Sequence, residues 1–173
     1  MAILPDWRIR ALCTGAAPMV APFDPELLNP ASLDVRLGET IMIESAEGPA
    51  LVPYPLSDHD QGDPYWFWPG QFILAHTVEV FNLPDGISAQ FVLKSSRARE
   101  GLNHLLAGWC DPGWHGSSLT LELQNVRQLQ AVPIWPGMEV GQMVFHSMSD
   151  PPERSYREVG RYNGDRSVQG SRG

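Results

Sequence analysis

The chain alternates hydrophobic and polar residues over several short stretches. Residues 32–37 place Leu33, Val35 and Leu37 on one side, and residues 119–124 repeat the same period of two. A period of two indicates a β-strand with one buried face. Further strands are predicted at residues 40–44, 66–68, 71–80, 87–94, 132–134 and 140–147.

Few stretches fit a helix. Residues 5–13 are the best candidate, because Asp6 can cap the first turn and Trp7 and Ile9 belong to a partly apolar face. Residues 95–101 fit a short helical turn at the end of a predicted strand.

Turn signals separate the predicted strands. Asn29-Pro30, Pro69-Gly70 and Pro136-Gly137 are typical turns, and residues 45–65 read as a loop with short pieces of strand. Many short strands joined by turns predict a mainly β fold, either a distorted β-barrel or a jelly-roll-like sandwich. Because no linker divides the chain, we expect one domain over residues 1–173, ending in a mobile polar tail at 150–173.

The composition narrows the classes of function. The 173 residues include 16 Gly and 16 Pro with only 18% charged residues, which argues against a helical bundle. A net charge of −8 argues against a DNA or RNA partner, which needs a basic face. No apolar run reaches the ~18 residues of a membrane span, and neither a hydrophobic leader nor a disulfide framework is evident. We therefore expect a cytoplasmic protein with no membrane partner.

Several familiar catalytic motifs are missing from the sequence. The His-x-Glu and Pro-Cys-x-x-Cys patterns of zinc-dependent nucleobase deaminases are absent, so we expect no zinc. The phosphate-binding Gly-x-x-x-x-Gly-Lys-Ser/Thr loop and the Gly-x-Ser-x-Gly elbow are absent too. Cys110 reads as a buried thiol, and a surface or structural role is expected for each of the scattered histidines: His59, His76, His104, His115 and His146.

Four stretches remain as candidates for chemistry. In residues 107–116 the two tryptophans could belong to the core or flank a base, and the tail from Tyr156 could be a disordered polar segment or close over an anionic ligand.

The other two stretches are polar clusters. The first runs from Lys94 to Arg99 and offers two hydroxyls and three cations, including Arg97, which suit an oxyanion-rich ligand. A solvated turn explains the same residues. The second is Glu122, which lies on the polar face of its predicted strand. If that face lines a closed cleft, burial makes this carboxylate a better general base, and otherwise Glu122 is simply solvated.

Six pieces of sequence stand in a characteristic order. They are residues 30–38 (PASLDVRLG), Lys94-Ser95-Ser96-x-x-Arg99-x-Gly101-Leu102, Asp111-Pro112-Gly113-Trp114-x-Gly116, Leu121-Glu122-Leu123-x-Asn125, Pro136-Gly137-Met138, and a tail with Tyr156, Arg161 and Tyr162. This order and spacing resemble the dCTP deaminase branch of the dUTPase-like superfamily over nearly the whole chain.

The resemblance implies both an assembly and a reaction. It implies a homotrimer with each active site between subunits and with the C-terminal tail folding over the bound nucleotide. The implied enzyme is a dCTP deaminase that hydrolyses dCTP to dUTP. Magnesium would accompany the triphosphate, and no catalytic metal would activate the water.

The resemblance also implies residue roles. Glu122 would deprotonate the water that attacks C4 of cytosine and would deliver protons toward N3 and the leaving ammonia. Ser95 and Arg99 would hold this water, Glu122 and the phosphates. Ser96 would contact a phosphate, Lys94 replaces the usual arginine, and we count Arg97 of the same cluster among the substrate-binding residues.

Other roles fall on the later part of the chain. Asp111 would contact the deoxyribose, while Thr120 and Leu121 would frame the base through their backbone. Tyr156 and Arg161 would contact the phosphates, with Arg161 in place of the usual lysine.

Two positions depart from the deaminase pattern. Trp109 replaces an arginine near the base, and Asp165 replaces the usual tail glutamine. Ala107-Gly108-x-x-Asp111 is similar to the third motif of trimeric dUTPases, whose aspartate activates water at the α-phosphate. The alternatives are therefore a dUTPase, a bifunctional enzyme that takes dCTP to dUMP, or a non-catalytic nucleotide-binding homologue.

Overall fold

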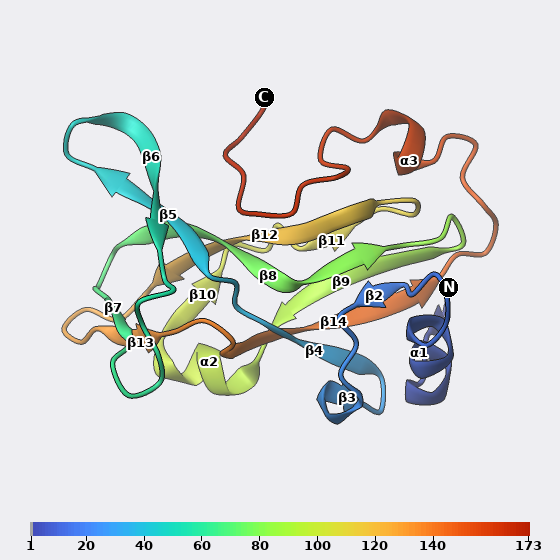
Figure 1. Cartoon of the computed structure of the whole chain (residues 1–173), viewed down its shortest axis with the longest axis horizontal. Helices are drawn as coiled ribbons and strands as arrows, with labels where there is room; N and C mark the ends of the chain where they lie inside the picture. The colour runs from blue at the N-terminus through green and yellow to red at the C-terminus, as the bar shows by residue number, and fades with distance from the viewer. Residues whose placement is uncertain (1) are drawn as a thin grey trace.

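The computed structural model describes residues 2–173 and consists mainly of antiparallel strands in two facing sheets (Figure 1). The predicted mainly β class is confirmed. Within the described residues neither six-stranded sheet pairs its own two edge strands, so the jelly-roll-like description applies and a closed barrel does not.

The first sheet joins the first strand of the described chain, β1, to the last one, β14. Its order is β11-β9-β14-β4-β3, and β1 pairs with β14. Every pairing is antiparallel, with β14 at the centre between β9 and β4. The bounds are β1 Ala2–Ile3, β3 Leu28–Asn29, β4 Ser32–Arg36, β9 Ile87–Leu93, β11 Trp109–Cys110 and β14 Glu139–Ser147.

The second sheet is built around its two longest strands. Its order is β10-β12-β8-β5-β6, and β2 pairs with β8. The bounds are β2 Val20–Ala21, β5 Thr40–Ser45, β6 Gly48–Pro55, β8 Phe72–Asn82, β10 Leu102–His104 and β12 His115–Asn125. A separate pair joins β7 (Tyr65–Phe67) to β13 (Val132–Ile134).

The core lies where the apolar faces of the strands meet. Val35 on β4 and Leu37 directly after it are fully buried, and so are Leu121 and Leu123 on β12, as their alternation predicted. Large side chains such as Phe81 and Phe145 fill the space between the sheets. The polar residues that alternate with Leu121 and Leu123 consequently face away from the core.

The described residues also form four short helices outside the sheets: α1 (Asp6–Cys13), the 3₁₀ helix η1 (Pro25–Leu27), α2 (Ser95–Glu100) and α3 (Tyr156–Val159). The predicted first helix is confirmed, but two details of it are wrong. Pro5 occupies the N-cap and Asp6 already lies in the first turn, because proline suits the start of a helix. Trp7 is 66% exposed, while Ile9 is buried.

The segment expected to be mostly loop contains a full strand. The strand β6 pairs with β5 in one register from Thr40 opposite Pro55 to Glu44 opposite Leu51, and after a register shift Ser45 lies opposite Gly48. The sequence signal was weak because β6 contains Pro49, Pro53 and Pro55. Prolines are tolerated there because β6 is the edge strand and leaves one side without backbone partners.

The C-terminal tail, residues 150–173, lies along β12 and the turn before it (Figure 1). Backbone hydrogen bonds join Tyr156 N to Pro112 O at 3.0 Å, Gly164 N to His115 O at 3.1 Å, and Ser118 N to Asp165 O at 2.8 Å. The tail therefore covers part of β12 and of the turn before it. A mobile tail that closes over a nucleotide stays a prediction. Among residues 2–173 no helix is long and apolar enough to cross a membrane.

Candidate active site

A cavity of about 820 Å³ lies between β12, the end of β11 and the C-terminal tail. Its apolar wall comes from β5, β6 and β8, and its polar groups come from the turn after β11, from β12 and from the tail. The lining residues are Met42, Ala50, Leu51, Phe72, Leu74, Ala107, Trp109, Cys110, Asp111, Trp114, Ser118, Leu119, Thr120, Glu122, Tyr156, Tyr162, Asp165 and 169–171.

Glu122 enters this cavity from the polar face of β12. Its neighbours Leu121 and Leu123 point into the core, so the alternation of the strand directs Glu122 to the opposite side. The side chain is 28% exposed. The structure thus favours the cleft interpretation of Glu122 over the fully solvated one.

Asp111 stands at the turn that follows β11, and Trp109 holds it. The Trp109 indole Nε1 donates to Asp111 Oδ1 at 3.0 Å, and the indole ring stacks on His146 with centroids 6.1 Å apart. Trp109 is 51% exposed and lines the cavity, so it is not a core side chain. Cys110 points inward, and burial raises the pKa of its thiol.

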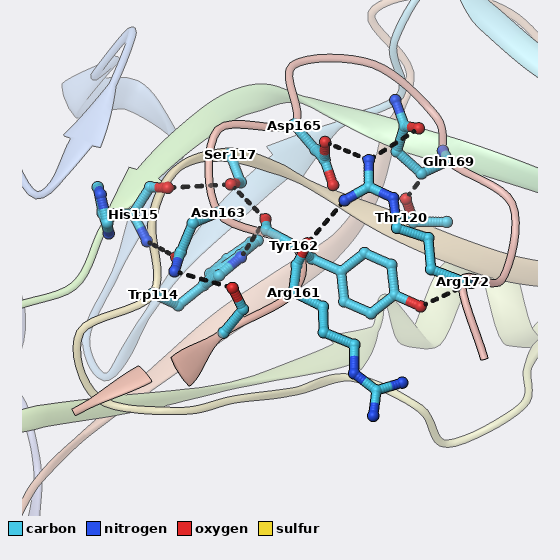
Figure 2. Close-up of polar contacts among 11 residues, drawn as sticks. Trp114, His115, Ser117, Thr120, Arg161, Tyr162, Asn163, Asp165, Gln169 and Arg172 are labelled. Atoms are coloured by element: carbon cyan, nitrogen blue, oxygen red, sulfur yellow. Dashed lines mark hydrogen bonds and ion pairs between the residues drawn. The ribbon is translucent and has the colours of Figure 1, made fainter. Parts of the chain in front are cut away.

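The tail is hydrogen-bonded to β12 and to the residue before it (Figure 2). Trp114 Nε1 and Ser117 Oγ both donate to Tyr162 O, at 3.2 Å and 2.7 Å. His115 N donates to the Asn163 side-chain oxygen at 3.1 Å. The buried Trp114 ring also stacks on Phe81 of the core. Trp114 therefore anchors the tail to the sheet.

Arg172 ties the tail to itself. Its Nη2 donates to Asp165 Oδ1 at 2.7 Å and to Gln169 Oε1 at 3.3 Å, and its Nη1 donates to Arg161 O at 2.7 Å (Figure 2). The guanidinium lies over the Tyr162 ring, 5.3 Å from its centroid. The hydrogen bond to Asp165 raises the pKa of Arg172. The negative charge of Asp165, unexpected beside a polyphosphate, is thereby neutralised within the tail.

Of the other predicted residues of this region, Thr120 and Tyr156 line the cavity, whereas Leu121 and Arg161 do not. Thr120 lines the cavity, and its Oγ1 accepts from Gln169 N at 3.4 Å, whereas Leu121 is buried in the core. Tyr156 lines the cavity, and burial raises the pKa of its hydroxyl. Arg161 is exposed and lies outside the cavity lining.

The cationic cluster of the sequence lies away from the cavity, on and before α2. Ser95, Ser96 and Arg99 are exposed there. Arg97 Nη1 pairs with Glu100 at 2.6 Å, and Lys94 forms ion pairs with carboxylates of β4 and β14, Asp34 and Glu139. Burial lowers the pKa of Lys94, but these hydrogen bonds outweigh burial and the pKa is raised overall. Within one chain, these residues and Glu122 are therefore not brought together.

The cavity is acidic, because the cationic cluster at α2 lies outside it. Asp111, Glu122 and Asp165 contribute carboxylates, and the part of the lining that the structure describes includes neither lysine nor arginine. An anionic ligand needs cations, and the described lining residues do not supply them.

Sequence reasoning missed two features of the site. Arg172 was not distinguished from other polar residues of the tail, although an arginine eleven residues after Arg161 can reach back to it. His104 was given a surface or structural role, yet its Nε2 lies 3.4 Å from Glu122 Oε2. The signal for His104 is only its place on a strand that pairs with β12.

The comparisons with known proteins first define the fold. The chain superposes on a dUTPase of phage phi11 of S. aureus with a TM-score of 0.50, at 16% identity over 85% of this chain and 94% of that one. This likeness shows a dUTPase-like fold. A dCTP deaminase-like family model then matches residues 3–148, and the chain belongs to that family.

Two further relatives agree with this assignment. A "dCTP deaminase, dUMP-forming" of Acidothermus cellulolyticus is 37% identical over 98% of this chain and 94% of its own length. The crystal structure of 2′-deoxycytidine 5′-triphosphate deaminase from Agrobacterium tumefaciens has a TM-score of 0.67 at 25% identity. That match covers 84% of this chain, which spans 48% of the crystallised one.

Proposed function

We propose that this protein converts dCTP to dUMP by two hydrolytic steps in the cavity between β12 and the tail. The observation that carries the proposal is that Glu122 and Asp111 share one cavity in a dCTP deaminase-like chain. The name of the Acidothermus relative favours dUMP, the alternative from the sequence, over dUTP, which the resemblance led us to expect first.

Glu122 serves the deamination. Its carboxylate takes a proton from water as the oxygen attacks C4 of cytosine. The proton passes to N3, and a second transfer makes the amino nitrogen a leaving group, so that the C4–N bond breaks and ammonia departs. The balance is dCTP plus water to dUTP plus ammonia. General base catalysis of this kind contributes ~10²–10⁴-fold to the rate.

Asp111 serves the hydrolysis of the triphosphate. Because Trp109 occupies Oδ1 of this carboxylate, Oδ2 is free to take a proton from a second water. That water attacks the α-phosphorus, the bond to the β-phosphate oxygen breaks, and pyrophosphate leaves. The balance is dUTP plus water to dUMP plus pyrophosphate.

Magnesium enters this scheme as part of the substrate. Mg²⁺ is commonly bound through substrate phosphates while it keeps several water ligands. Residues 2–173 contain no group of three or more His, Cys, Asp or Glu side chains arranged to hold a metal. We therefore treat magnesium–dCTP as the molecule that binds.

A homotrimer would complete the site. The cavity has three carboxylates and lacks basic lining residues in the described chain, whereas α2 presents Ser95, Ser96 and Arg99 to solvent. A neighbouring subunit that places its α2 over the cavity would supply the missing cations. Mixing Glu122→Gln subunits with Arg99→Gln subunits, each inactive alone, should restore activity. No recovery after verified subunit exchange would contradict a shared site.

The overall reaction is tested by product analysis. The purified protein is incubated with magnesium and dCTP, and nucleotides, ammonia and pyrophosphate are measured over time. One ammonia and one pyrophosphate should appear for each dCTP consumed, with dUMP as the nucleotide product. Release of dUTP alone would support a simple deaminase, and unchanged dCTP would support a nucleotide-binding homologue. A cytoplasmic location stays a prediction.

A further inference from the structure

We infer that His104 is a positioning residue that holds Glu122 for the deamination step. His104 ends β10, and only 5% of the residue is exposed. Its Nε2 atom lies 3.4 Å from Oε2 of Glu122. The inference rests on the proposed role of Glu122 as the group that carries protons.

The two facing atoms lack other partners. Among the described residues, both Nε2 of His104 and Oε2 of Glu122 are buried without a hydrogen-bond partner. Buried polar atoms left unpaired are unfavourable, so a small closing movement that joins them satisfies both. Hydrogen bonds at catalytic groups are often long without substrate and shorten when it binds. A separation of 3.4 Å is consistent with such a pair.

Packing fixes the plane of the His104 ring. The ring lies on Phe91 with centroids 4.6 Å apart and an angle of 56° between the planes. Gly108 packs closely against both side chains, because a Cβ at this residue would lie 2.8 Å from Phe91 Cβ and 3.3 Å from His104 Cε1. An enclosed ring of this kind has little freedom to turn its Nε2 away from Glu122.

The backbone ties the two residues to each other as well. His104 pairs with Leu123, the neighbour of Glu122, in the β10–β12 ladder. Leu105 N donates to Glu122 O at 3.3 Å. With a proton on Nε2, His104 can thus donate to Oε2 of Glu122 and leave Oε1 to take the proton from water. His104 itself exchanges no proton with the substrate in this account.

The test compares two reactions of the same cavity. Deamination needs Glu122, whereas hydrolysis of added dUTP needs Asp111. His104→Phe keeps a flat ring but removes the donor. It should lower kcat for ammonia release from dCTP about 10²-fold, the typical cost of a slightly misplaced catalytic group. Pyrophosphate release from dUTP and the KM for dCTP should stay unchanged.

A second variant separates positioning from folding. His104→Gln retains an N–H close to the place of Nε2 and should recover most of the ammonia release. His59→Phe is the matched control, because His59 bonds to the Tyr54 hydroxyl at 3.1 Å outside the cavity. It should leave both reactions intact.

Three results would overturn the inference. The first is an equal loss of both reactions in His104→Phe and His104→Gln, which indicates a role in folding only. The second is full ammonia release by His104→Phe. The third applies if His104→Phe does not fold, and it is an equal rate of ammonia release in His104→Gln and His104→Met. A wild-type protein that releases no ammonia from dCTP would instead refute the proposed function itself.

Discussion

Replacing Trp109 by phenylalanine removes one hydrogen bond and little else. Phenylalanine keeps an aromatic ring over His146 but lacks the indole N–H that reaches Asp111 Oδ1 at 3.0 Å. A hydrogen bond to a charged group contributes ~1.5–3 kcal/mol when it is buried, and less here because Trp109 is 51% exposed. We take about 1 kcal/mol, which corresponds to about a fivefold change in rate.

The assay follows pyrophosphate release from dUTP, the step assigned to Asp111. Trp109→Phe should slow this release about fivefold and leave ammonia release from dCTP and the melting temperature nearly unchanged. Trp109→Ala should in addition alter the ratio of kcat/KM between dCTP and its 5-methyl derivative, because the indole surface lines the cavity. A large loss of melting temperature without any change in these rates would show that Trp109 only supports the fold.

Three further predictions concern other groups. Arg172→Gln should raise the KM for dCTP more than it lowers kcat, since Asp165 would face the phosphates with its charge uncompensated; an unchanged KM would contradict this. Burial raises the pKa of Cys13 to about 11 and that of Cys110 still further, so a thiol reagent at pH 8 should label neither thiol until urea is added. Burial lowers the pKa of His76, so the unfolded chain binds a proton there more readily than the folded one. Stability should then decrease as the pH falls below ~6.5, the ordinary histidine value. His76→Gln should flatten this decrease in urea midpoints measured from pH 8 to 5, and an unaltered slope would contradict the assignment.

Strand positions were predictable from the sequence where one face of the strand is buried. Leu121 and Leu123 alternate with Glu122, and this period of two places the strand and its polar face together. The strand β6 was harder to predict, because an edge strand exposed on much of its surface has no strong period and tolerates Pro53 and Pro55. The pairing partner, which the sequence does not show, decides such a strand.

The site was predictable to the extent that it is local in the chain. Glu122, Asp111 and Asp165 line the cavity that the sequence led us to look for. The sequence did not predict the roles of His104 and Arg172. The partner of His104 is distant in sequence, and the partners of Arg172 depend on how the tail folds. No local pattern signals that a histidine on a neighbouring strand ends 3.4 Å from a glutamate.

The central claim is that one cavity carries out two hydrolytic steps with two carboxylates. Its most direct test is Asp111→Asn, incubated with magnesium and dCTP, with Asp58→Asn on the exposed β6–β7 loop as the control. Loss of the second general base should slow pyrophosphate release ~10²–10⁴-fold, so the variant should release ammonia and accumulate dUTP. Formation of dUMP by Asp111→Asn at the rate of the wild-type protein and the control would contradict the claim.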